Sequence, residues 1–350
     1  MMIAEFITSR DPRWTRYLRT APHDFYHVPE YAELCAKHEK GVAAAFYAED
    51  GGATFLAPVL IRAIPRTLDA PAGWYDCVSP YGYSTPVVTP CQESLERFLE
   101  AFCHAARERS IVTAFFRLHP LLPLNLQVLG KFGQLAKHGQ TVYVDLSKSA
   151  DDIWRQTREN HRRDIRTLER LGFRVLLDEW SLLEAFMRLY DMTMRRVGAR
   201  SDYLFSREYF QELRATLGSH LHLCTVLSKE DEVASAGTYV DWDGIVQFHL
   251  AGNETKYLSL APSKLMQHFM CGWAKETSNS VFHLGGGVGG VEDSLFEFKA
   301  GFSKQRADFF TYRIVLDEEK NALLSRAAEA QMKDARDVAP DFFPVYRKAL

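Results

Sequence analysis

A glycine-rich segment between an expected strand and an expected helix is the part of this sequence most suited to chemistry. Residues 281–303 read VFHLGGGVGGVEDSLFEFKAGFS, and five of the six residues 285–290 are glycine. Such a run lets backbone N–H groups approach a ligand, and the following helix has an N-terminus that favours negative charge. The following helix carries Phe298 and Lys299. We therefore expect the turn with Gly286 and Gly287 to lie against a substrate or donor.

Other interpretations of this segment are weaker or remain open. Gly285, Gly287 and Gly290 satisfy G-x-G-x-x-G, but no βαβαβ unit fits after them, and no acidic residue ends a second strand at the distance that a dinucleotide site requires. The Gly-Lys-Ser/Thr ending of a nucleotide P-loop is absent. The alternative that stays open is a structural turn, with Lys299 a solvated helix lysine and Phe298 a core residue.

Composition narrows the class of protein. A chain of 350 residues can form two domains, and its net charge of -3 gives no overall attraction to nucleic acid or anionic lipid. Contact with RNA or a phosphorylated substrate would therefore need a local basic patch. No apolar run reaches the ~18 residues of a membrane span, and no secretory leader is evident, so we expect a cytoplasmic protein.

The cysteines predict a reducing compartment and no metal centre. They lack C-x-x-C pairs and metal-ligand spacing, and we expect mostly buried thiols. Their positions are Cys35, Cys77, Cys91, Cys103, Cys224 and Cys271.

Hydrophobic periodicity and turn residues predict an α/β chain of two domains with a tail. The expected domains are 1–147 and 148–317, followed by a peripheral helical tail at 318–350. In the first domain we expect strands at 42–47, 54–61, 111–118 and 141–146 and a helix at 91–109. In the second we expect helices at 150–171, 181–197, 206–217, 262–277 and 293–302 and strands at 173–177, 221–228, 233–241, 245–251, 281–284 and 308–316.

Three blocks of residues resemble the Fem-type (FemAB-like) branch of the GNAT, or Gcn5-related, acyltransferases, including BioF2-like acetyltransferase domains. One is the 281–303 segment, whose glycines and Phe298-Lys299-x-x-Phe302 match the pattern G-G…F-K-x-x-F. The second is the basic helix and strand of 154–175. The third joins the 74–83 segment, WYDCVSPYGY, with Arg117-x-His119-Pro120.

The resemblance implies an α/β fold of two GNAT-like domains, each with a mixed β-sheet flanked by helices, and an acceptor cleft at or near their interface. The first domain would be a degenerate duplicate of the second. Phe298 and Lys299 would line the channel where the donor carbonyl meets the acceptor amine. The ammonium group of Lys299 would there stabilise the oxyanion or a donor phosphate. Cell-wall members often have an acid where this chain has His119, which makes His119 a candidate base and puts a cell-wall acceptor in doubt. A structural histidine is the alternative.

The remaining candidates are binding residues. We expect Arg117, Tyr81 and Tyr83 to bind phosphate or sugar hydroxyls, with an aromatic turn as the alternative. Strand alternation places Gln247 and His249 on one face, which in GNAT folds meets donor and acceptor. Further candidates, Ser263 and Lys264, stand where acetyltransferases have their pyrophosphate loop, although the usual glycine signature is missing.

A basic helix leaves two interpretations open. Six arginines between 155 and 170 suggest contact with RNA or phosphate, whereas the acidic residues among them suggest i,i+4 pairs on a solvated face. The acidic residues are Glu159, Asp164 and Glu169.

The predicted function is amide formation. An aminoacyl or acyl group would move from an activated carrier to an amine by direct attack, with no permanently bound cofactor. Aminoacyl-tRNA is the first expected donor and acyl-CoA the second. The acceptor would be a peptidoglycan precursor, a glycan amine or a natural-product intermediate. A non-catalytic binding protein on the same scaffold is a further alternative.

Overall fold

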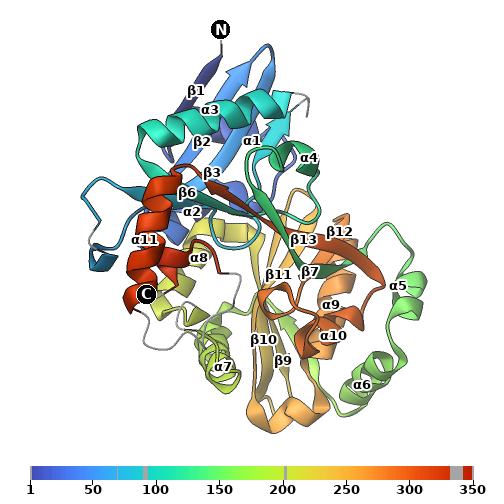
Figure 1. Cartoon of the computed structure of the whole chain (residues 1–350). Helices are drawn as coiled ribbons and strands as arrows, with labels where there is room; N and C mark the ends of the chain where they lie inside the picture. Colours follow the sequence, from blue (N-terminus) through green and yellow to red (C-terminus); the bar gives the residue numbers. More distant parts are fainter. Residues whose placement is uncertain (1, 69, 90–93, 201–202, 332–341, 349–350) are drawn as a thin grey trace. The chain divides into compact units, whose positions relative to one another are not determined.

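The structure is a computed structural model that describes residues 2–68, 70–89, 94–200, 203–331 and 342–348. Its strands are β1 (Ile3–Thr8), β2 (Val42–Asp50), β3 (Ala53–Ala63), β4 (Tyr75–Val78), β5 (Val87–Thr89), β6 (Ile111–Arg117), β7 (Gln134–Asp145), β8 (Arg174–Leu177), β9 (Leu221–Leu227), β10 (Val233–Trp242), β11 (Ile245–Asn253), β12 (Val281–Gly285) and β13 (Gln305–Val315) (Figure 1). Its α-helices are α1 (Pro12–Leu18), α2 (Pro29–His38), α3 (Leu95–Glu108), α4 (Leu126–Leu129), α5 (Ala150–Gln156), α6 (Glu159–Arg170), α7 (Leu183–Arg196), α8 (Arg207–Leu217), α9 (Ser263–Glu276), α10 (Ser294–Ala300) and α11 (Glu318–Gln331).

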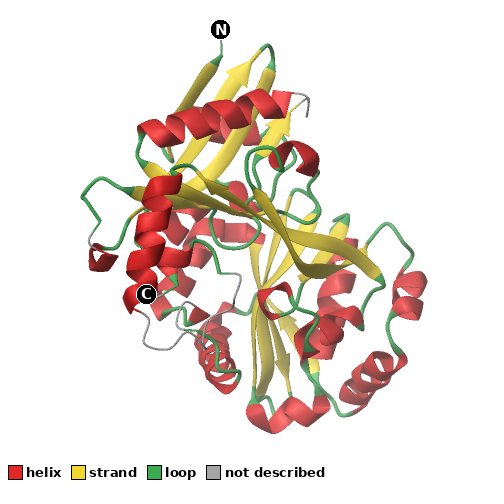
Figure 2. Cartoon of the chain, viewed as in Figure 1, coloured by secondary structure: helices red, strands yellow, loops and turns green. Residues whose placement is uncertain are grey.

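The prediction of an α/β chain is confirmed, and Figure 2 shows helices packed beside the strands. One predicted helix is wrong: 150–171 forms two helices, α5 and α6, with Thr157 and Arg158 between them. These two residues have extended backbones, with ψ of 129° and 144°. The N–H of Arg158 bonds to the carbonyl of Gly301 at 2.8 Å, so a tertiary contact replaces a helical one.

Contacts divide the chain into two compact units that differ from the predicted domains. Unit 1 comprises residues 1–138 and 309–350, and unit 2 comprises residues 139–308. The chain passes between the units within β7 and again within β13. A boundary drawn once along the sequence at 147 therefore differs from this division.

The order of elements occurs twice along the chain. From β1 to β7, the short β5 aside, it is β-α-α-β-β-β-α-β-α-β, and the same order runs from β8 to β13. This repetition agrees with the expected duplicate.

The two repeats exchange their last strands. In unit 1, the sheet order is β1-β2-β3-β4-β6-β13, with β4 and β6 parallel and the other neighbours antiparallel. In unit 2, the order is β7-β12-β11-β10-β9-β8, in which β11 and β12 form the parallel pair. In each unit, the second strand of the parallel pair thus pairs with a strand that the chain order assigns to the other repeat.

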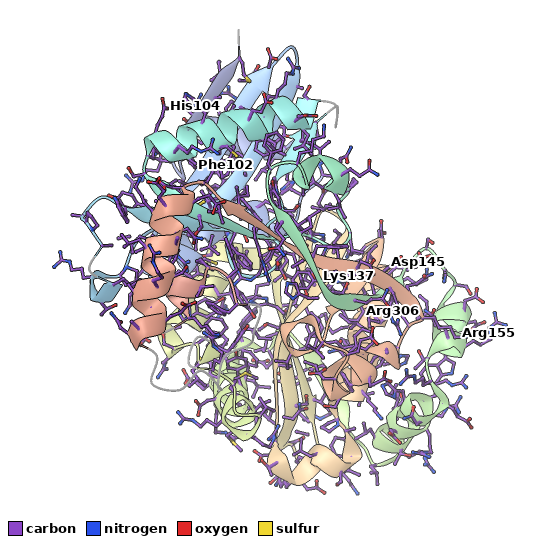
Figure 3. The ribbon with its side chains drawn as sticks, in the orientation of Figure 1. Phe102, His104, Lys137, Asp145, Arg155 and Arg306 are labelled. Carbon is purple, nitrogen blue, oxygen red and sulfur yellow. The ribbon has the colours of Figure 1, made fainter. Side chains whose placement is uncertain are left out.

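Aromatic side chains fill the core of unit 1. α3 lies across the strands β1 to β3 (Figure 1), and Phe102 on its inner side meets Phe6, Phe46 and Phe116. His104 on the outer side of the same helix is exposed (Figure 3). The apolar spacing of α3 therefore buries one helical face against the sheet.

The C-terminal tail packs into unit 1, so the expectation of a peripheral tail is wrong. Leu324 of α11 and Tyr346 are fully buried, and the Tyr346 hydroxyl lies 2.6 Å from Oγ1 of Thr113. Arg347 binds the buried carboxylate of Asp76 at 2.7 Å. Residues 332–341 and 349–350 of the predicted tail lie outside the described residues.

Five cysteines are free and buried, whereas Cys91 lies outside the described residues. Within the described ranges, no cluster of His, Cys, Asp and Glu is arranged to hold a metal ion. No helix of the described chain has the length and apolarity needed to cross a bilayer.

A histidine held by two carboxylates should make the stability of the fold pH-dependent. Nδ1 of His222 lies 2.9 Å from Asp178 and Nε2 lies 3.3 Å from Asp241. Burial disfavours the charged imidazole, but the two carboxylates prevail and raise the pKa of His222 to about 9.

Because this pKa is raised above its unfolded value, the stabilisation is complete below pH ~6.5 and is lost as the pH rises through about 9. Solvent screening at the half-exposed Asp178 limits this contribution to the free energy of unfolding to about 1–2 kcal/mol. The free energies of unfolding of His222→Gln and of the wild type, measured in urea, should thus differ at pH 6 and become equal at pH 10. The exposed control, His104→Gln, should differ little at either pH, and an equal pH dependence in both variants would contradict the assignment.

Candidate active site

Two neighbouring parallel strands part from each other in unit 2. β11 and β12 pair only from Ile245 with Val281 to Gln247 with His283. Beyond that point β11 continues to Asn253, whereas β12 ends at Gly285. Backbone groups on the β12 side of residues 248–253 are therefore released from this ladder, and a substrate group that enters here can meet them.

Lys299 lies where these strands part. Its Nζ donates a hydrogen bond of 2.6 Å to the carbonyl of Gly286, just after β12, and lies 5.8 Å from the ring centroid of Phe248, the first β11 residue beyond the pairing. The residue is 8% exposed, and burial lowers the pKa of Lys299 to about 8 although Asp293 opposes the shift. The alternative of a solvated helix lysine is therefore wrong.

The glycine turn is shaped by its own backbone and by Asp293. A Cβ on Gly287 would lie 2.0 Å from the carbonyl oxygen of Val291, so a side chain there is excluded. Gly285 has a φ of 77°, a value that favours glycine. The carboxylate of Asp293 accepts hydrogen bonds from the N–H groups of Val288 and Phe296, and so caps α10. This cap fixes the helix that carries Lys299.

A β-bulge interrupts the strand alternation on which the prediction for Gln247 and His249 rests. Thr238 pairs with Leu250 and Tyr239 with Phe248, which leaves His249 as the extra residue. Gln247 is buried and its Oε1 lies 2.7 Å from Nδ1 of His283. Burial lowers the pKa of His249 to about 4, so this imidazole is neutral at physiological pH.

Phe298 joins α10 to α6. Its ring packs against those of His161 and Phe302, and its carbonyl lies 2.9 Å from Nε2 of His161. A Cβ on Gly301 would lie 2.2 Å from the same imidazole, so the ring occupies the space that a side chain would need. Phe248 and His161 were not among the predicted site residues. The alternation of β11 gave a reason to consider Phe248, whereas nothing in the sequence distinguishes His161.

The predicted donor-binding pair lies at the start of α9. Lys264 is nearly buried, and its Nζ makes an ion pair of 2.6 Å with Asp164 of α6. Ser263 is the first residue of α9. A donor phosphate at this helix start would have to compete with Asp164 for the ammonium group, and the binding role of both residues stays a prediction.

His119 is enclosed in unit 1. The N–H of Leu121 donates to Nδ1 at 3.1 Å, so Nε2 carries the ring proton and donates to Asp24 at 3.0 Å. Both side chains are 0% exposed. To act as a base, the imidazole would have to give up the bond to Leu121. The geometry therefore favours a structural histidine, and its catalytic role stays a prediction.

The other predicted binders in unit 1 are Tyr81, Tyr83 and Arg117, of which Tyr83 packs beside this histidine. The ring of Tyr83 lies 6.0 Å from that of His119, and the Tyr81 carbonyl accepts a hydrogen bond from Tyr31 at 3.2 Å. The guanidinium of Arg117 lies 5.2 Å from the ring centroid of Phe115, and its buried Nη1 makes no hydrogen bond within the described chain. Arg117 thus has donor capacity for an anionic ligand.

The predicted site residues therefore form two groups. Unit 2 holds Lys299, Gly286, Gly287, Phe298, Gln247, His249, Ser263 and Lys264. Unit 1 holds His119, Arg117, Tyr81 and Tyr83.

Comparison with known families finds a match, which covers the segment around Lys299. Residues 155–299 match the model of a family described as an acetyltransferase (GNAT) domain. The matched segment contains the parting strands, the glycine turn and Lys299. The chain thus contains a segment that matches a GNAT acetyltransferase domain. No curated protein matches it.

Solved structures of low sequence identity share the fold over most of the chain. FemX has a TM-score of 0.67 at 14% identity, covering 88% of this chain and 96% of that chain. L-PGS from Bacillus licheniformis has a TM-score of 0.58 at 14% identity, with coverage of 91% and 96%. The C-terminal domain of a putative lysylphosphatidylglycerol synthetase from Agrobacterium fabrum has 0.56 at 15%, with coverage of 91% and 95%. These identities support the fold alone, and the resemblance noted in the sequence is confirmed at that level.

Proposed function

We propose that this protein forms amide bonds by moving an aminoacyl or acyl group from an activated carrier to an amine. The observation that carries the proposal is the position of Lys299. A cation that is buried, has a pKa near 8 and lies where two parallel strands part is suited to a carbonyl that gains negative charge.

In the proposed reaction, the acceptor amine attacks the carbonyl carbon of the donor and a C–N bond forms. The carbonyl oxygen becomes an oxyanion, which Lys299 or a backbone N–H stabilises. The intermediate collapses as the bond to the carrier breaks. The proton lost by the amine goes to the substrate itself or its leaving group, because His119 has both ring nitrogens engaged.

Aminoacyl-tRNA is the first donor that we propose, because the whole-chain fold resembles FemX and the Fem-type motifs imply it. Acyl-CoA is the second, favoured by the acetyltransferase family to which residues 155–299 match. The proposed acceptors are the amines of a peptidoglycan precursor, a glycan or a natural-product intermediate. Free thiols in the described chain fit a reducing, cytoplasmic setting for this chemistry.

The donor can be identified by ligand-induced stabilisation. The purified chain would be melted with uncharged tRNA, with CoA and with an acyl-CoA panel, because a ligand at 100 times its Kd stabilises the fold by about 2.7 kcal/mol. We expect stabilisation by tRNA, followed by transfer of a labelled aminoacyl group to an amine panel. Stabilisation by CoA and not by tRNA would exclude the first donor.

A further inference from the structure

One face of α6 consists of charged side chains. A shallow hollow there is lined by Glu159, Arg162, Arg163, Arg166, Glu169 and Arg170. At 100° per residue these positions fall on one side of the helix, and the buried His161, Ile165 and Leu168 fall on the other. α6 therefore packs on unit 2 with one side and presents four arginines to solvent with the other.

Three of these arginines have no acidic partner among the residues that the structure describes. Arg163 pairs with Asp164 at 3.2 Å, and the nearby Arg155 and Arg158 pair with Asp152 and Glu297. Arg162, Arg166 and Arg170 make no ion pair with any described residue. The i,i+4 pairs expected with Glu159 and Glu169 are therefore not formed. We call Arg162, Arg166 and Arg170 the arginine stripe.

The spacing of the arginine stripe suits an extended polyanion. Its members follow one another at four-residue intervals, so their Cα atoms rise by about 6 Å each and about 12 Å in all. Guanidinium groups bind phosphate oxygens in a bidentate manner. Arg166 is also held over the ring of Trp154 at 5.4 Å, which limits the conformational entropy it loses on binding. The stripe can thus meet successive phosphates along one strand.

The opposite side of α6 contacts elements of the candidate site. Asp164 pairs with Lys264 at the start of α9, and His161 lies 2.9 Å from the carbonyl of Phe298, the neighbour of Lys299. Figure 1 shows α5 and α6 at the margin of unit 2, and Figure 3 shows Arg155 projecting from α5 into solvent. A ligand on the stripe would therefore bind to a helix that packs against both α9 and α10.

We propose that the arginine stripe binds the sugar-phosphate backbone of the RNA that carries the donor group, which rests on the proposed function above. The lining of the face contains no apolar side chain, whereas a helix that binds a bilayer inserts apolar residues. A stripe about 12 Å long also exceeds what a compact pyrophosphate needs. A net charge of -3 makes such a local patch necessary for RNA binding.

The test measures binding of fluorescently labelled, uncharged tRNA to the full chain over a salt series. The test variant is Arg162→Ala/Arg166→Ala/Arg170→Ala. We expect it to bind roughly 10–100-fold more weakly at low salt, with the slope of log K against log salt reduced by about 2. The matched control is Arg174→Ala/Arg195→Ala/Arg207→Ala, which removes three exposed, ion-paired arginines of unit 2 and the same net charge. It should bind tRNA nearly as the wild type does.

An equal loss in both triple variants, or none in the stripe variant, would overturn the inference. If Lys299-dependent transfer from charged tRNA persists in that case, the proposed function stands without this surface. A wild type that binds no tRNA would overturn both the surface and the first donor, as would stripe-dependent binding only to anionic phosphatidylglycerol vesicles. Melting curves establish folding, and Arg166→Ala alone, expected to weaken binding severalfold, replaces the triple variant if that fails to fold.

Discussion

Replacing Lys299 by Met is expected to lower kcat/KM for acyl transfer by about 10²–10³-fold while the chain remains folded. The ammonium group lies where β11 and β12 part, so its removal takes away a positive charge from the position where the oxyanion would form. Steady-state kinetics with the donor found in the tRNA and CoA panel would measure the loss. A non-catalytic protein would instead retain its biological activity in this variant.

The stability of the same variant separates catalysis from structure. Because the pKa of Lys299 falls from 10.5 to about 8, keeping the group charged costs the folded state about 3 kcal/mol near neutral pH. In the wild type this cost disappears as the pH rises from about 8 to 10.5, where the folded chain has lost a proton that the unfolded chain still binds. Lys299→Met removes this cost but also loses the hydrogen bond to Gly286, which is worth less. The variant should therefore melt at the wild-type temperature or above it.

The pH profile supplies the control for Lys299. If the charged ammonium group stabilises the oxyanion, kcat/KM should fall as the pH rises through about 8. Lys299→Arg keeps its charge at that pH, so any activity that it retains should not show this decline. A wild-type profile that stays flat from pH 7 to 9 would contradict the role.

Replacing Asp24 by Ala is expected to destabilise the fold by about 2–4 kcal/mol. Its carboxylate is 0% exposed, accepts a hydrogen bond of 2.6 Å from the N–H of Phe25 and binds Nε2 of His119. The substitution leaves a buried ring N–H without its acceptor and removes an N-cap. Urea unfolding would measure the change.

Asp11→Ala is the matched control, because Asp11 also caps a helix with its side chain but lies nearer the surface. It should cost only about 1 kcal/mol. A comparable small loss for Asp24→Ala would contradict a structural Asp24–His119 pair. His119→Ala is then expected to lose stability but, once folded, to keep its kcat, whereas a base would lose both.

Much of the fold follows from local patterns in the sequence. Because glycine and proline separate short apolar runs, the sequence predicts the hairpin of β10 and β11 and the order of elements in unit 2. Lys299 was found because glycines precede a helix that carries a Phe-Lys pair, a short-range signal. Its burial was open, since one lysine on an amphipathic helix can point either way.

Features that depend on contacts between residues far apart in the sequence could not be predicted. The break between α5 and α6 depends on the carbonyl of Gly301, and Lys264 pairs with Asp164, one hundred residues away. The bulge at His249 depends on the register with β10. The sequence leaves open whether His119 is a base or a structural histidine, because no residue near it in the sequence indicates that Asp24 and Leu121 engage both nitrogens.

The exchange of β7 and β13 has a consequence for dissecting this protein. A fragment that stops at residue 138 would lack the 311–315 segment that pairs with β6, so one edge of its sheet would be bare. A fragment that begins at residue 148 would lack the β7 segment that pairs with β12. Neither fragment should fold by itself as a soluble domain. The intact chain is expected to unfold in a single melting transition. Gene fission between the repeats would therefore succeed only if both pieces were made together.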